Sequence, residues 1–402
     1  MIRTQEAAEL VKRLGALEAP VLTVYADINP ANPDNRGGGW RTRVKNALKE
    51  IAPIHERRKH AKSLYEEVLE TISEERPTAR TMALFARQDE HGKAHIERID
   101  LNVDLPVVDL GQGRVEARWG EPYVAPLVYA LDEYQRAGVI HVDGAKWRFF
   151  EIFLGEIREC EEVFEELDEE DWKALREASE FIRSGRLRAE ARADLSGSNK
   201  DAWKAKLQHW RHKLYRRLAR LAEKAVKALG IDRLVLMGDE TETGVLYNTL
   251  PRSLREKVAA RVSNPEDLNE PNKEDILERV LPALEEAERA GELALLDEIR
   301  EQPGPKGMCE VLDALQFGRL EVIVLPWGLD AEVWHCPDPA DWYTCNEDDA
   351  RTLCGEAAGK VHLRDRLFRL ADDYGTRIEL VQGPAEERLR AEFDGVAGLR
   401  RW

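Results

Sequence analysis

Apolar residues follow two patterns along this chain, short β-branched runs and stripes with helical spacing. The runs predict strands at 21–28, 81–87, 94–101, 138–144, 147–153, 233–238, 321–326 and 377–381. The stripes, with steps of three and four residues, predict helices at 5–17, 40–51, 124–135, 201–229, 273–290, 308–316 and 363–374. Helices and strands that alternate in this way predict an α/β fold in which helices cover sheets.

The helix predicted over 201–229 is basic on every face except its apolar stripe. The stripe comprises Trp203, Leu207, Trp210, Leu214, Leu218, Leu221 and Ala225. Ten Lys or Arg residues between Lys200 and Lys227 oppose only two acids, a local charge of +8 in a chain of −17. An excess this one-sided predicts a surface that meets a polyanion, and the alternative is a helix face that is only solvated.

Two further segments are strongly charged. Residues 36–62 form a second cationic segment, with nine Lys or Arg residues against two Glu, and this segment begins inside a turn-rich loop at 29–39. The three consecutive glycines of the loop, 37–39, are not followed by the Gly-Lys-Ser/Thr of a phosphate-binding P-loop. The run at 156–180 holds twelve acids and three bases, which is typical of a solvated face and also allows pairing with the basic helix.

Length and composition limit the class of protein. A chain of 402 residues predicts two to four domains, and no apolar run approaches the roughly 20 residues that span a bilayer. No apolar segment near the N-terminus marks the chain for secretion. Five sparse cysteines, an odd number, predict free thiols in a reducing cytoplasm. A linker rich in Pro, Asn and acid at 263–272 helps to place three predicted domains, 1–122, 123–264 and 273–402.

Several local strings, taken in order, resemble one family. They are the strand, Asn-Pro loop and basic helix of 21–51, the segments 138–160 and 232–262 on either side of the long helix, and the strings 307–321 and 393–402. Together they resemble the bacterial relatives of archaeo-eukaryotic class 1 release factors and Pelota, a group that includes Balon-like ribosome hibernation factors. The resemblance implies an N-terminal α/β domain that faces the decoding site, a central RNase H-like domain and a C-terminal domain of L7Ae-like fold.

The same resemblance implies a ribosome-binding factor that occupies the aminoacyl site, with elongation factor Tu or a related GTPase as a partner. The two cationic segments then become the candidates for ribosomal RNA contacts. These candidates are Arg36, Trp40, Arg41, Arg43, Lys45, Lys200, Lys204, Arg211, Arg216 and Arg220.

The chain departs from true release factors at the loop predicted over 195–199. Where release factors carry Gly-Gly-Gln, the matching tip reads Gly197-Ser198-Asn199. Asn199 is one methylene shorter than Gln and Ser198 lacks the backbone freedom of glycine, whereas catalysis tolerates errors of only about 0.5 Å. We therefore expect occupancy without peptide release, in hibernation or in rescue of stalled ribosomes.

Three other chemistries stay open. Asn199 could still serve a peptidyl-tRNA hydrolase, and Asp27, Asp143 and Asp239, each after a predicted strand, could hold metal in a ribonuclease. Third domains of the family carry a zinc-bearing insertion, which makes Cys336, Cys345 and Cys354 zinc candidates. The closely spaced cysteine pairs of zinc ribbons are missing, so a metal-free site is favoured over zinc.

Overall fold

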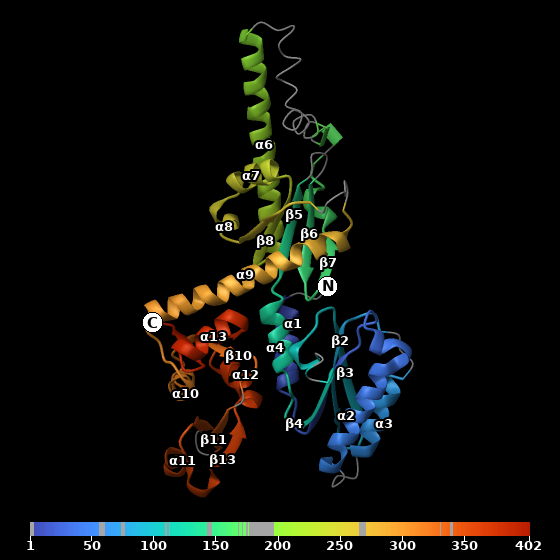
Figure 1. The fold of residues 1–402 in the computed structure, drawn as a ribbon, viewed down its shortest axis with the longest axis vertical. Coiled ribbons are helices and arrows are strands. Elements are labelled where there is room, and N and C mark those ends of the chain that lie inside the picture. Colours follow the sequence, from blue (N-terminus) through green and yellow to red (C-terminus); the bar gives the residue numbers. More distant parts are fainter. Residues whose placement is uncertain are drawn as a thin grey trace. The chain divides into compact units, whose positions relative to one another are not determined.

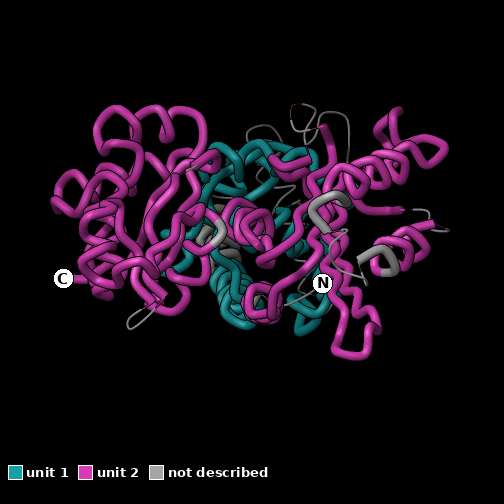
Figure 2. The backbone as a smooth tube through the Cα atoms, turned by 90° about the horizontal axis from the view of Figure 1, so that it is seen from below, with its two compact units in different colours: residues 1, 3, 135–288 teal, residues 2, 4–134, 289–402 magenta. Residues whose placement is uncertain are grey.

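The structure is a computed structural model that divides into two compact units, Gln135–Glu288 and the combination of Thr4–Tyr134 with Arg289–Trp402 (Figure 2). It describes residues 4–55, 61–73, 77–108, 111, 113–142, 147–167, 169–170, 172–173, 176, 197–264, 271–329, 331–337 and 341–402. Only the backbone is described for 4–5, 52–55, 61–63, 197–212 and 365. Among the described residues, no helix is both long and apolar enough to cross a membrane.

The unit Gln135–Glu288 is built on one five-stranded sheet, with strand order β7-β6-β5-β8-β9 (Figure 1). Its strands are β5 (Ala137–Val142), β6 (Trp147–Phe153), β7 (Glu156–Glu159), β8 (Arg233–Gly238) and β9 (Val258–Val262). The first three pair antiparallel, and β8 and β9 continue the sheet parallel to β5. This mixed order agrees with the RNase H-like fold that the resemblance implies.

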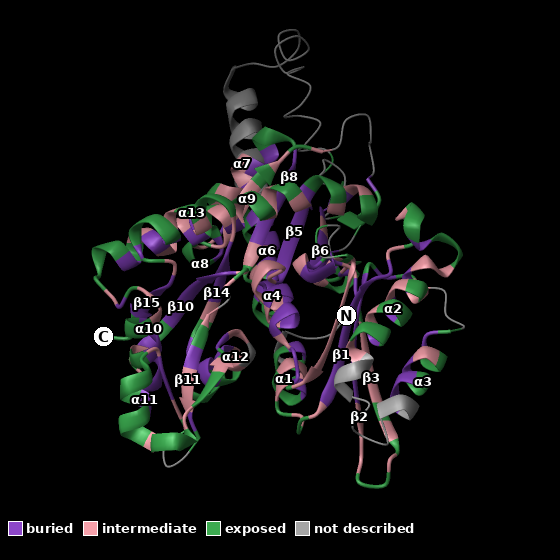
Figure 3. Ribbon diagram, turned by 60° about the horizontal axis from the view of Figure 1, so that its bottom comes forward, coloured by how far each residue is buried: buried purple, intermediate pink, exposed green. Residues whose placement is uncertain are grey.

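Side chains alternate across this sheet, so each face carries its own apolar layer. Ile140 and Phe149 belong to the layer under α6 (Gly197–Leu229), α7 (Glu240–Thr249) and α8 (Arg252–Arg255). Val139 and Phe150 belong to the opposite layer, which α9 (Lys273–Glu301) covers with Ile276. The central strands β5 and β8 are therefore buried on both sides (Figure 3).

The basic helix α6 confirms the predicted stripe wherever its side chains are described. Leu214, Leu218, Leu221 and Ala225 are all buried, whereas the side chains of Trp203, Leu207 and Trp210 lie outside the described set. The helix begins at Gly197, four residues earlier than predicted, so Gly197-Ser198-Asn199 forms its first turn and the predicted loop is wrong there. Ser and Asn favour helix N-termini as well as turns, and the sequence pattern does not separate the two.

The N-terminal part of the other unit is a four-stranded antiparallel sheet, β3-β2-β1-β4. Its strands are β1 (Val21–Asp27), β2 (Thr81–Gln88), β3 (Ala94–Leu101) and β4 (Val115–Gly120). Its helices are α1 (Thr4–Gly15), η1 (Pro33–Gly38), α2 (Gly39–His55), α3 (Ala61–Thr71), η2 (Pro106–Val108) and α4 (Ala125–Glu133). Residues of α2 and α3 share one apolar core with β1 and β2.

The C-terminal part holds two three-stranded sheets, β14-β10-β15 and β12-β11-β13. The strands are β10 (Leu320–Pro326), β11 (Glu332–Cys336), β12 (Trp342–Thr344), β13 (Gly359–His362), β14 (Arg377–Val381) and β15 (Ala397–Arg400). The helices, besides the end of α9, are α10 (Met308–Gln316), α11 (Glu347–Cys354), η6 (Gly355–Ala357), α12 (Arg364–Asp373) and α13 (Gly383–Glu392). Each sheet of the molecule uses residues of one predicted domain, and the domain bounds themselves stay a prediction.

Two disulfides join the small sheet to its helices. Cys309 of α10 bonds to Cys345 after β12, and Cys336 of β11 bonds to Cys354 of α11. The prediction of free thiols is therefore wrong for these four and holds for Cys160, which is free and buried. The counting rule failed because a sparse, odd set still leaves two pairs that the fold brings together.

Candidate nucleic-acid interface

The outer face of α6 is a row of exposed cations. Lys213, Arg216, Arg220, Lys224 and Lys227 follow one another at steps of three and four, so they line one side of the helix. The buried stripe holds the opposite side of the helix against the sheet. Because apolar contacts hold one face of the helix against the sheet, the basic face is directed away from the core.

Three cations of this row have no carboxylate partner among the described residues. Lys224 Nζ lies 3.7 Å from Glu166 Oε1, and Lys227 Nζ lies 3.1 Å from Glu223 Oε1. Lys213 and Arg216 have no such contact, and Arg220 donates only to the backbone oxygen of Arg216, at 3.3 Å. We call Lys213, Arg216 and Arg220 the open cationic row.

The open cationic row suits a phosphate backbone better than a single small anion. Lys213 and Arg220 are seven residues apart, which places them about 10 Å apart along the helix axis. Exposed guanidinium and ammonium groups at such spacing contact successive phosphates and release the ions that those phosphates hold. The spacing and exposure of these cations are therefore those expected of a phosphate-binding surface, and RNA binding itself stays a prediction.

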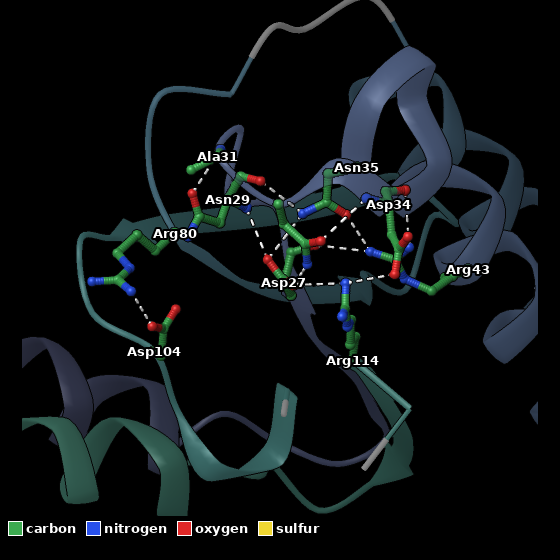
Figure 4. A network of polar contacts seen from close by, with 10 residues as sticks. Asp27, Asn29, Ala31, Asp34, Asn35, Arg43, Arg80, Asp104 and Arg114 are labelled. Atoms are coloured by element: carbon green, nitrogen blue, oxygen red, sulfur yellow. Dashed lines mark hydrogen bonds and ion pairs between the residues drawn. The ribbon is translucent and has the colours of Figure 1, made fainter. Parts of the chain in front are cut away.

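In the N-terminal sheet, Asp27 organises the loop that precedes α2 (Figure 4). Its carboxylate accepts hydrogen bonds from the backbone N–H of Asn29 at 2.9 Å, from Asn32 Nδ2 at 2.6 Å and from Asn35 Nδ2 at 3.0 Å. Asn35 is buried and also donates to the backbone oxygen of Asn29. Asp27 therefore shapes this loop, which is why the Asn-rich sequence folds into an ordered turn.

Two arginines close the same network from other elements. Arg43 of α2 donates to Asn35 Oδ1 and, at 3.3 Å, to the backbone oxygen of Asp34. Arg114 Nη1 lies 3.0 Å from the carboxylate of Asp34 and 3.9 Å from the carboxylate of Asp27. Burial lowers the pKa of Arg43 from its ordinary value, but a guanidinium stays charged in proteins. Arg43 thus holds the loop together, and its role as an RNA contact stays a prediction.

The predicted RNA contacts of the first cationic segment separate into two groups. Trp40 is 1% exposed and lies in the core under the sheet, so its prediction as an RNA contact is wrong. Arg41 is half-buried, with its guanidinium 5.3 Å from the centroid of the Trp40 ring. Arg36 and Lys45 are exposed and remain candidates.

In the second segment, Arg216 and Arg220 are on the open cationic row, and the side chains of Lys200, Lys204 and Arg211 lie outside the described set. The same holds for the side chains of the Gly197-Ser198-Asn199 turn. Lys213 also belongs to this row, although it is not among the RNA contacts predicted from the sequence. It could have been predicted, because it lies three residues before Arg216 and seven before Arg220, on the same side of the helix.

The cysteines do not fit zinc in this form of the chain. Cys336 and Cys354 are bonded to each other and Cys345 is bonded to Cys309, whereas a zinc ligand must be a free thiolate. His335 Nε2 instead contacts Asp341 Oδ1 at 2.5 Å. Across the described ranges, no group of three or more His, Cys, Asp or Glu side chains is arranged to hold a metal ion. For the reduced chain, the preference for a metal-free site over zinc stays a prediction.

The strand-end carboxylates have structural partners where the structure describes them. Asp27 holds the loop before α2, and Asp239 caps α7 by accepting from the backbone N–H groups of Thr241 at 2.9 Å and Glu242 at 3.3 Å. Asp143 lies outside the described residues. Caps and loop turns explain Asp27 and Asp239 without a metal ion.

Comparison with known proteins identifies the central segment. Residues 122–285, which include the five-stranded sheet and α6, match the model of bacterial archaeo-eukaryotic release factor family 10. This match confirms the predicted resemblance for the central segment: residues 122–285 are similar to the bacterial archaeo-eukaryotic release factors. No curated protein matches the chain at a significant level.

Solved structures of the wider group cover most of the chain at low identity. An archaeal translation termination factor, aRF1, has 14% identity and a TM-score of 0.24, covering 100% of this chain and 99% of its own. Archaeal Pelota, from a model of ribosome-bound Pelota and ABCE1, has 14% identity and a TM-score of 0.41, with 100% and 95% covered. Dom34 of S. cerevisiae has 10% identity and a TM-score of 0.38, with 80% and 79% covered. Structural similarities with TM-scores this low give no argument about the function of this chain.

Proposed function

We propose that this chain is a translation factor that binds the ribosome at the aminoacyl site without releasing the nascent peptide. The observation that carries the proposal is the open cationic row on α6, because it lies within the segment that matches the release factor family. A basic face of this kind, in a chain whose net charge is −17, is suited to ribosomal RNA. Arg36 and Lys45 offer a second set of exposed cations in the N-terminal sheet domain.

The turn at the start of α6 supports binding without hydrolysis. In true release factors the release reaction depends on a Gln at the tip of the matching segment, and here Asn199 is one methylene shorter. In addition, Asn199 belongs to the first turn of a helix, so its backbone is committed to helical geometry. A water-positioning amide that is displaced by this much loses most of its effect on rate. Ribosome hibernation and rescue of stalled ribosomes are the two roles that need occupancy alone.

The proposed partners are the ribosome and a GTPase such as elongation factor Tu. The GTPase is an expectation from the family resemblance, and we propose it for delivery of the chain to the ribosome. The competing function is peptidyl-tRNA hydrolysis through Asn199, which a peptide-release assay distinguishes from binding alone.

Mixing the chain with 70S ribosomes that carry peptidyl-tRNA in the peptidyl site is expected to give a complex that sediments with the ribosome and releases no peptide. Bound chain and free peptide are measured in the same fractions, with a bacterial release factor and a stop codon as the positive control. Peptide release that disappears in Asn199→Ala would establish the hydrolase instead. A chain that stays in the soluble fraction at low salt would refute ribosome binding.

A further inference from the structure

A cavity of about 210 Å³ lies at the edge of the five-stranded sheet, between the start of β6 and the acidic segment after β7. Its described lining residues are Trp147, Arg148, Phe149, Glu159, Cys160, Glu161, Phe164, Glu165, Leu167 and Trp172. A water molecule takes about 30 Å³ in the liquid, so the cavity has room for about seven waters or one long side chain. It is smaller than the roughly 300–1,000 Å³ typical of pockets for cofactors and drug-sized ligands.

The charge of this cavity is negative. Glu159 is neutralised by Arg148, whose Nε and Nη2 atoms donate to the two carboxylate oxygens of Glu159 at 2.9 and 2.6 Å. Glu161 and Glu165 are exposed, and no described cation pairs with either. Burial raises the pKa of the Cys160 thiol to about 11, so this wall is uncharged at neutral pH. The two glutamates, four residues apart across the 3-10 helix η3 (Glu161–Phe164), leave two uncompensated negative charges at the mouth.

The remaining walls are aromatic, and one of them holds an unused donor. Phe164 packs edge-on against Trp172, with ring centroids 6.4 Å apart, and edge-on against Trp147 at the same distance. Trp147 is 1% exposed, yet its buried indole Nε1–H has no hydrogen-bond acceptor among the described residues. A buried donor without a partner is unfavourable, so an acceptor that reaches it stabilises the complex.

We propose that this cavity binds an arginine side chain from a peptide segment of a partner protein. A guanidinium stacks on indole faces and pairs with carboxylates, which are the two features that the walls and the mouth supply. The peptide carbonyl beside that arginine provides the acceptor that Trp147 Nε1–H lacks. The site is remote in sequence from the open cationic row and has the opposite charge, so the inference does not depend on ribosome binding.

The test uses the full-length chain labelled with ¹⁵N and follows the indole N–H signals of its tryptophans. The signals of Trp147 and Trp172 are assigned from Trp147→Phe and Trp172→Phe. The probe is N-acetyl-arginine N-methylamide, and the matched probe is the citrulline analogue, which has nearly the same shape and no charge. We expect both signals to shift and saturate with the arginine probe at millimolar concentration, with binding of the citrulline probe weaker by about tenfold or more, as loss of a paired cation requires.

A pair of matched variants tests the role of the mouth. Glu161→Gln with Glu165→Gln is expected to weaken binding of the arginine probe about three- to tenfold. Glu169→Gln with Glu170→Gln changes the charge of the same exposed segment equally and does not alter the described lining, so it should leave the dissociation constant unchanged. Absence of a saturable shift, equal binding of the two probes, or equal weakening by both variants would each overturn the proposal.

Discussion

Replacing Trp40 with alanine is expected to lower the free energy of unfolding of the part of the chain built on the β3-β2-β1-β4 sheet by about 3–5 kcal/mol. The indole is 1% exposed and shares its core with Val44 and Leu48 of α2 and with β1. Removing it opens a cavity that the surrounding helices fill only in part, because packed cores relax incompletely. Chemical denaturation followed by tryptophan fluorescence and circular dichroism compares the unfolding of the variant with that of the unaltered chain.

The neighbouring lysine provides the control for this prediction. Lys45 is exposed on the same helix, so Lys45→Gln should change stability by no more than about 0.5 kcal/mol. If Trp40→Ala left the unfolding curve unchanged and weakened ribosome binding, Trp40 would be an RNA contact and its placement in the core would be wrong.

Loss of either disulfide is expected to destabilise the C-terminal part of the chain by about 3–4 kcal/mol, from the entropy of closing its loop in the unfolded state. The sequence separations are 36 residues for Cys309–Cys345 and 18 for Cys336–Cys354. The two loops overlap, so losing both should cost less than the sum. Thermal unfolding with and without reductant, and of Cys309→Ser with Cys345→Ser, measures the effect.

A thiol count decides whether the bonds are present. The denatured chain should titrate one free thiol, Cys160, before reduction and five after it. Cys160→Ala serves as the matched control, because it removes the cysteine that follows β7 and should leave the stability of the C-terminal part unchanged. Five thiols without reductant, or a reduced chain with unchanged stability, would show that the bonds do not stabilise the fold.

The strands and helices that the sequence predicted have strong, local apolar periods. The sequence patterns did not predict the remaining described strands and α-helices, which are the strands β4, β7, β9, β11, β12, β13 and β15 and the helices α3, α7, α8, α11 and α13. The ends of the predicted helices and strands were less predictable than their positions. The helix predicted to end at Ala290 runs on to Glu301, since apolar contacts of Leu296 and Ile299 outweigh the helix-ending tendency of Gly291. Strand β4 was missed because its residues are all only half-buried, with Glu116 and Arg118 paired along one edge.

The candidate site was predictable as a charge excess and not as a set of contacts. A count of cations cannot separate Arg43, which holds the Asp27 loop, from Lys45, which faces solvent two residues later. On α6 the helical spacing supplies that separation, because the apolar stripe fixes which face is buried. The cysteine pairs could not be predicted from the sequence, because the bonded residues come from four different segments of the C-terminal part that only the fold brings together.

The proposed function depends on ribosome binding through α6, and the salt dependence of that binding tests it most directly. The variant Lys213→Gln, Arg216→Gln, Arg220→Gln removes the open cationic row. The control Arg252→Gln, Lys273→Gln, Arg279→Gln removes three exposed cations of the same unit that are not on α6. Affinity for 70S ribosomes is measured for both and for the unaltered chain over a range of salt concentrations.

The α6 variant should bind more weakly, and the slope of log affinity against log salt should become shallower by about 2–3, from about 0.7–0.9 per phosphate contact. The control should keep the slope of the unaltered chain. If the α6 variant binds ribosomes with unchanged affinity and unchanged slope, the basic face of α6 is only a solvated surface and the proposed mode of binding is wrong.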